Sequence, residues 1–119
     1  MSIVSVILIA QGAASAIERT LASLEKQRQN VDLELVYVED DNSQAMSKSL
    51  MALVETFQPT QLRREKAGHF SQLWNDGLLK TESPFLMILE PGQVLADNAI
   101  KILLEALEED PSFGAAFGR

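Results

Sequence analysis

The chain has 119 residues, of which 46% are hydrophobic and 23% charged, a composition typical of one soluble globular domain. The absence of cysteine and the single histidine exclude disulfides, thiolate metal sites and zinc sites built from several histidines. The formal net charge of −7 argues against nucleic acid or an anionic membrane as a partner, because both require a basic face. No apolar run is long enough to span a bilayer or has the form of a targeting segment, so we expect a cytoplasmic protein.

Strand patterns and helix patterns alternate along the chain. In chain order, they predict a strand at Val4–Ala10, a helix with its stripe at 17–24, a strand at Leu33–Val38, a helix within 46–57, a short strand around Leu62 and Arg63, a helix within 70–78, a strand at Phe85–Leu89, a helix within 100–107 and a last strand at Phe113–Phe117. Such alternation favours a mostly parallel sheet with helices on both faces. The continuous β-branched run of the first strand predicts a place in the middle of the sheet, with Phe85–Leu89 beside it.

Polar residues follow three of these strands where each strand ends. They are Gln11-Gly12, the acidic turn from Glu39 to Ser43, and Glu90-Pro91-Gly92-Gln93. In open parallel sheets ligands bind beyond the carboxyl ends of the strands. The three segments are therefore the candidate site.

The acidic turn is the strongest local signal. Glu39, Asp40 and Asp41 are consecutive carboxylates that repel one another, so a cation or a ligand donor beside them is favourable. Carboxylates also accept hydrogen bonds from a nucleotide base or from ribose hydroxyls. The alternative is an exposed turn in which Asn42 or Ser43 caps the next helix.

The other two strand ends carry weaker signals. Small residues after Gln11 let a ligand approach the backbone and the start of the next helix, which suits a phosphate, although no glycine-rich fingerprint or P-loop lysine is present. In the third segment only Glu90 can supply a charged oxygen to a divalent cation, and the alternative is a plain Pro-Gly turn. Elsewhere, His69 is interpreted as a turn or helix-start residue, and Trp74 as a core residue on an apolar stripe.

Taken in order, these features resemble the nucleotide-binding half of the family 2 glycosyltransferases, which have the GT-A fold. The similar segments are Val4–Leu8, Ile17–Leu24 with its I-x-x-T-L-x-S-L pattern, Glu34–Asp40, Asn75–Leu78, Phe85–Glu90, Val94–Leu107 and Gly114–Arg119. The resemblance implies a three-layer α/β sandwich with a mostly parallel, Rossmann-like sheet. It also implies that residues 1–119 form one domain that binds a nucleotide-diphosphate sugar and lacks the acceptor-binding half.

The same resemblance assigns site residues. The implied nucleotide-binding residues are Ala10, Gln11, Gly12, Glu39, Asp40 and Asn75, and the implied ligand of a weakly held Mn²⁺ or Mg²⁺ is Glu90. A nucleotide or nucleotide sugar is the implied partner, with UDP as one candidate nucleotide.

The sequence also departs from the family pattern. Ile9 and Gln11-Gly12 stand where the family usually has Pro and Tyr-Asn, Trp74 stands where it usually has an arginine, and Glu90-Pro91-Gly92 replaces its D-x-D motif. The region that normally carries the general base has no counterpart here, so no catalytic residue is assigned.

Three functions therefore remain open. The first is a glycosyltransferase-like domain that is weak or inactive alone, and the second is a non-catalytic nucleotide-binding or protein-interaction module with the same fold. A receiver domain is disfavoured, because it needs an acidic pair after the first strand, where Gln11-Gly12 stands. We also expect homo-oligomers, because a missing second half would leave apolar surface or an open strand edge near Gly114 to Phe117.

Overall fold

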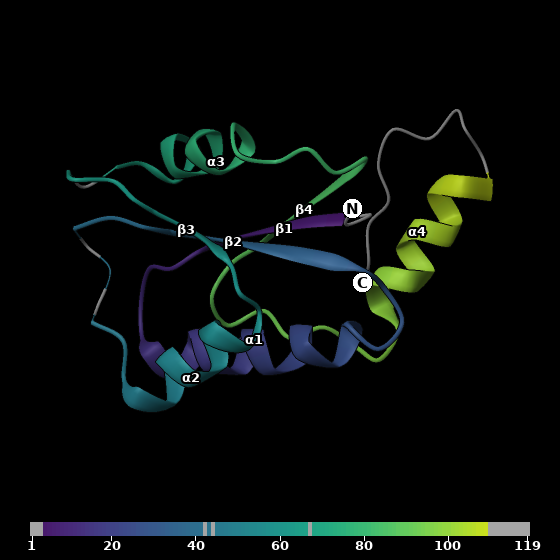
Figure 1. The fold of residues 1–119 in the computed structure, drawn as a ribbon, viewed down its shortest axis with the longest axis horizontal. Coiled ribbons are helices and arrows are strands. Elements are labelled where there is room, and N and C mark those ends of the chain that lie inside the picture. Colours follow the sequence, from purple (N-terminus) through teal and green to yellow (C-terminus); the bar gives the residue numbers. More distant parts are fainter. Residues whose placement is uncertain (1–3, 42, 44, 67, 110–119) are drawn as a thin grey trace.

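The computed structural model describes residues 4–41, 43, 45–66 and 68–109, in which strands and helices alternate (Figure 1). The elements are β1 (Val4–Ile9), α1 (Ala14–Gln27), β2 (Leu33–Glu39), α2 (Lys48–Thr56), β3 (Thr60–Arg63), α3 (Phe70–Leu78), β4 (Phe85–Leu89) and α4 (Ala99–Glu109). Each corresponds to a predicted element, with bounds that differ by a few residues. The strand expected at Phe113–Phe117 lies outside the described residues.

The strands form a parallel four-stranded sheet in the order β3-β2-β1-β4. As predicted, β1 lies inside the sheet with β4 beside it, and Val6 is completely buried. Within the described residues β4 ends the sheet, and its Ile88 is half-buried. The register pairs Ile9 with Val38 and Leu8 with Leu89, so the carboxyl ends of β1, β2 and β4 meet at one edge.

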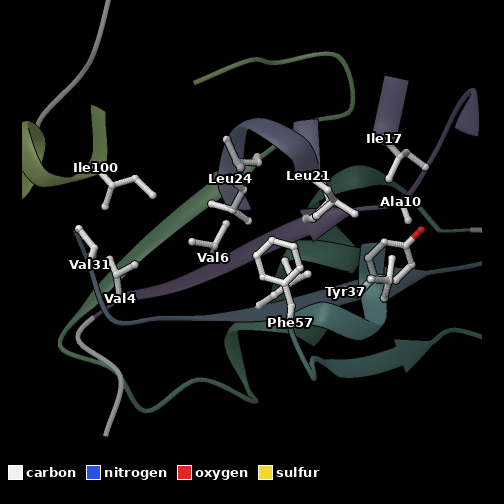
Figure 2. Close-up of a cluster of buried hydrophobic side chains, with 14 of the residues drawn as sticks. Val4, Val6, Ala10, Ile17, Leu21, Leu24, Val31, Tyr37, Phe57 and Ile100 are labelled. Atoms are coloured by element: carbon white, nitrogen blue, oxygen red, sulfur yellow. The ribbon is translucent and has the colours of Figure 1, made fainter. Parts of the chain in front are cut away.

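Helices cover both faces of this sheet. In Figure 1, α1 and α2 lie below the sheet and α3 lies above it. Alternate residues of β1 point to opposite faces of the sheet. Val6 and Leu8 belong to the apolar cluster between the sheet and α1, whereas Ile7 and Ile9 belong to the cluster between the sheet and α3. Figure 2 shows the larger cluster, where Leu21 and Leu24 of α1 pack above β1. The three-layer α/β prediction is confirmed.

One glycine permits the close packing of α3. A Cβ atom on Gly77 would lie 2.8 Å from Cγ2 of Ile7 and 3.4 Å from Cγ2 of Val38. A real Cβ atom does not fit at the shorter of these distances, so glycine lets α3 approach β1 and β2. Close packing of α3 on the sheet thus explains the glycine in the Asn75-Asp76-Gly77-Leu78 segment.

The helix caps only partly follow the prediction. Ser47 caps α2, because its Oγ accepts a hydrogen bond from the Leu50 N–H at 3.1 Å. The alternative in which Ser43 caps this helix is wrong, because the Ser43 Oγ instead accepts from the Asp40 N–H at 3.0 Å. Asn42, the other residue in that alternative, lies outside the described residues. His69 is the N-cap residue of α3, as its interpretation as a helix-start residue required.

Candidate functional site

The carboxyl edge of the sheet brings the three predicted segments together. The Ala10 N–H donates to the Val38 carbonyl at 2.8 Å, which keeps the chain beside the end of β2 after β1 has ended. Gly12 has a φ of +93°, a backbone conformation that favours glycine, and nothing lies within 4 Å of its Cβ position. Glu90 directly follows β4, on the other side of β1. The loops after three neighbouring strands thus face one edge.

Asp40 is the central residue of this edge, and it is fully buried. Its Oδ2 accepts hydrogen bonds from the Gly68 N–H at 2.9 Å and from the Gln11 amide Nε2 at 3.1 Å. The Asp40 carboxylate therefore joins the loop after β1, the end of β2 and the loop before α3. Because it is enclosed, the Asp40 carboxylate holds these loops together through hydrogen bonds.

An arginine from β3 compensates the rest of the acidic turn. Nη1 of Arg63 lies 3.6 Å from Oε2 of Glu39, and Nη2 lies 3.9 Å from Oδ1 of Asp41. The Glu39 side chain is 13% exposed and that of Asp41 is 58% exposed. The cation that the repelling carboxylates favour is thus supplied by the chain itself. Sequence reasoning missed this role of Arg63, although parallel pairing of the two strand ends would have indicated it.

A second arginine ties β3 to α3. The Arg64 N–H donates to the Glu39 carbonyl at 2.9 Å, and its Nη1 lies 3.1 Å from Oδ2 of Asp76. This pair holds α3 beside the acidic turn.

Near that turn, burial raises the pKa of Tyr37 to about 12, and the Glu39 carboxylate acts in the same direction. The Tyr37 hydroxyl therefore stays protonated at neutral pH.

The turn after β4 is held by the Gln93 side chain and by α1. The Glu90 N–H donates to Oε1 of Gln93 at 2.8 Å, and Gly92 has a φ of +95°. Glu90 itself is exposed. Across the described ranges, no three acidic or histidine side chains form a group that could hold a metal ion. A single exposed carboxylate does not make a cation site by itself.

The two α3 residues of interest differ in their surroundings. Asn75 is exposed, and in the described part of the chain its side chain has no hydrogen-bond partner. Trp74 packs on the apolar cluster under α3, with its ring centroid 5.0 Å from that of Phe70. Its indole Nε1 is buried without a hydrogen-bond partner among the described residues. The prediction of Trp74 as a packing residue is confirmed.

Of two hollows, one lies at the opposite edge of the sheet and the other borders the acidic turn through Arg63. One, of about 450 Å³, is lined by Lys26, Gln29, Asn30, Asp97 and Asn98. The other, of about 310 Å³, is lined by Leu62, Arg63, Asp76, Leu79 and Lys80. Neither includes a predicted nucleotide-binding residue or Glu90, so the candidate site is an open edge formed by loops.

A parallel α/β sandwich with loops gathered at the carboxyl edge defines a class of proteins that bind ligands at that edge. Comparison with protein families matches residues 5–119 to Glycosyl transferase family 2, and the chain belongs to this family. Comparison with the curated proteins finds no match.

Solved structures have the same fold. A mannosyltransferase, PcManGT from Pyrobaculum calidifontis, in complex with GDP-Man and Mn²⁺, has a TM-score of 0.79 at 19% identity, over 95% of this chain and 34% of that one. TarS residues 1–349 from S. aureus has a TM-score of 0.72 at 17% identity, over 100% of this chain and 39% of that one. The chain therefore spans little more than a third of these proteins. None of the helices in the described ranges is long and apolar enough to cross a membrane.

Proposed function

We propose that the chain binds the nucleotide of a nucleotide-diphosphate sugar at the carboxyl edge of its sheet, as the donor-binding domain of a glycosyltransferase. The observation that carries this proposal is the convergence of the Gln11, Glu39 and Glu90 loops at one edge of a family 2 domain. The structural neighbour in complex with GDP-Man and Mn²⁺ supports the same ligand class.

The proposed residues have different parts in binding. The backbone of Ala10, Gln11 and Gly12 receives the phosphates, because open space around Gly12 allows close approach and α1 begins just beyond. Glu39 offers its partly exposed carboxylate to the base or ribose. Buried Asp40 contributes through Gln11 and the loop at Gly68.

The remaining two residues have narrower roles. Asn75, which is exposed on α3, offers its free amide to the nucleotide. Glu90 would add one oxygen to a divalent ion, Mn²⁺ or Mg²⁺, bound together with the nucleotide phosphates. When bound, that ion would supply positive charge against the phosphates of the leaving nucleotide. One protein carboxylate predicts weak metal affinity.

We further propose that this chain alone transfers little or no sugar. Trp74 is packed in an apolar cluster and cannot give a phosphate the charge-assisted bonds of an arginine. The second candidate, a non-catalytic nucleotide-binding or interaction module, is favoured by Arg63, which already pairs with the acidic turn.

Calorimetric titration of the purified chain with UDP, GDP and ADP, with and without Mn²⁺, tests nucleotide binding. We expect weak binding of at least one diphosphate that Mn²⁺ strengthens. Turnover of the corresponding nucleotide sugar separates the two candidates: slow transfer supports the weak glycosyltransferase-like domain, and binding without any turnover supports the non-catalytic module. Robust Mn²⁺-dependent transfer would contradict both and restore a complete enzyme.

Self-association is also proposed. Leu86 on β4 is 50% exposed and Ile102 on α4 is 60% exposed, and β4 ends the described sheet. Apolar residues on an end strand favour pairing with another strand or surface. Light scattering at several concentrations is expected to show homo-oligomers, and a monomer at every concentration would contradict this.

A further inference from the structure

Three polar residues line the buried face of α1. Thr20, Ser23 and Gln27 are 0%, 6% and 1% exposed, and they lie on the same side of the helix as its apolar core residues. Burying such groups is unfavourable unless each finds a hydrogen-bond partner. We call these three residues the α1 polar stripe.

All three side chains have hydrogen-bond partners in the segment after β4. The Thr20 Oγ1 accepts from the Gly92 N–H at 2.9 Å, and the Ser23 Oγ accepts from the Leu95 N–H at 3.0 Å. The Gln27 amide uses both ends: its Nε2 donates to the Ala96 carbonyl at 2.8 Å, and its Oε1 accepts from the Ile100 N–H at 3.2 Å. Each contact lies about one helical turn beyond the previous one.

The hydroxyl groups are oriented for this purpose. The Thr20 hydroxyl donates its proton to the Ala16 carbonyl at 3.1 Å, and the Ser23 hydroxyl donates to the Thr20 carbonyl at 2.7 Å. A hydroxyl has one proton to donate, so both oxygens face the segment after β4 as acceptors. They therefore select backbone N–H groups there.

We infer that the α1 polar stripe fixes residues 92–100 on α1, and that Thr20 is a positioning residue for the turn that carries Glu90. The Gly92 N–H also points to the Ala16 carbonyl at 3.3 Å, so this turn lies over the first turns of α1. Those turns directly follow Gln11-Gly12. Thr20 thus keeps the loops after β1 and β4 in one arrangement, and its effect on ligand binding rests on the proposed function.

Thr20→Val tests the inference, because valine keeps the branched shape and removes the acceptor. We expect amide exchange of Gly92, measured by NMR, to accelerate about tenfold, and affinity for UDP or GDP to fall about fivefold, the effect of one hydrogen bond. Thr20→Ser keeps the hydroxyl, and it is expected to restore both properties.

Gln27→Leu is the matched control. It removes two hydrogen bonds from the same stripe at the opposite end of α1, so we expect lower stability with nucleotide affinity within twofold of wild type. Unchanged Gly92 exchange in Thr20→Val, no rescue by serine, or an equal affinity loss in Gln27→Leu would each overturn the inference. If wild type binds no nucleotide, the proposed function fails, and Gly92 exchange with serine rescue still decides the role of Thr20.

Discussion

Replacing Asp40 tests whether this carboxylate joins the loops of the site. Asp40→Ala removes the acceptor from the Gly68 N–H and from the Gln11 amide. An unsatisfied buried donor costs about 1–3 kcal/mol, whereas the half-exposed Gln11 amide can turn toward water. With the space left by the missing carboxylate, we expect a loss of about 3 kcal/mol in the free energy of unfolding.

Asp40→Asn is the matched control. Its amide oxygen can still accept from Gly68, so we expect a loss of about 1 kcal/mol. Urea denaturation measures both values, and amide exchange at Gly68 shows whether the loop before α3 has been released. Equal stability of the two variants, within about 0.5 kcal/mol, or slow Gly68 exchange in Asp40→Ala, would refute the role of the carboxylate as a loop acceptor.

Three further predictions concern the packing and charge around the site. Gly77→Ala forces a Cβ against Ile7, and after the gain in helix propensity we expect a net loss of about 1 kcal/mol by urea denaturation; an unchanged midpoint would contradict the close packing. Because the pKa of Tyr37 is raised from 10 to about 12, its stabilising contribution is complete below pH 10 and is lost as the pH rises to 12, by about 1.4 kcal/mol per pH unit. Tyr37→Phe is expected to have a correspondingly shallower fall in denaturation measured from pH 9 to 12, and an identical fall would contradict the burial of the hydroxyl. Arg63→Gln removes the cation beside Glu39, so we expect a loss below about 1 kcal/mol that shrinks in 1 M salt; a salt-independent loss would exclude an electrostatic origin.

The sheet could be predicted because its inner strands are apolar without interruption. Every residue of Val4–Ile9 is buried, and a strand covered on both faces has this pattern. The short strand Thr60–Arg63 was less distinct, because only Leu62 is partly buried. Parallel topology alone also predicted that the three strand ends would meet at one edge of the sheet.

The side-chain arrangement of the site was beyond the sequence. The sequence does not show which of the three consecutive carboxylates, Glu39, Asp40 and Asp41, is buried. In the structure Asp40 is fully enclosed and Asp41 is exposed. Among the partners that distinguish Asp40 is the Gly68 N–H, which is 28 residues away and donates to its carboxylate. The role of Thr20 likewise depends on Gly92, 72 residues away. Such contacts are set by tertiary packing and leave no local pattern.

The most direct test of a nucleotide site at the carboxyl edge is to locate the bound nucleotide from NMR chemical-shift changes of backbone amides. In a titration of ¹⁵N-labelled protein with UDP or GDP in the presence of Mg²⁺, we expect chemical-shift changes at Gln11, Gly12 and Gly92. Amides of Asn30 and Asn98, in the hollow at the opposite edge, are expected to stay unchanged. Shifts centred on that hollow, or no shifts at saturating nucleotide, would contradict a nucleotide site at the carboxyl edge.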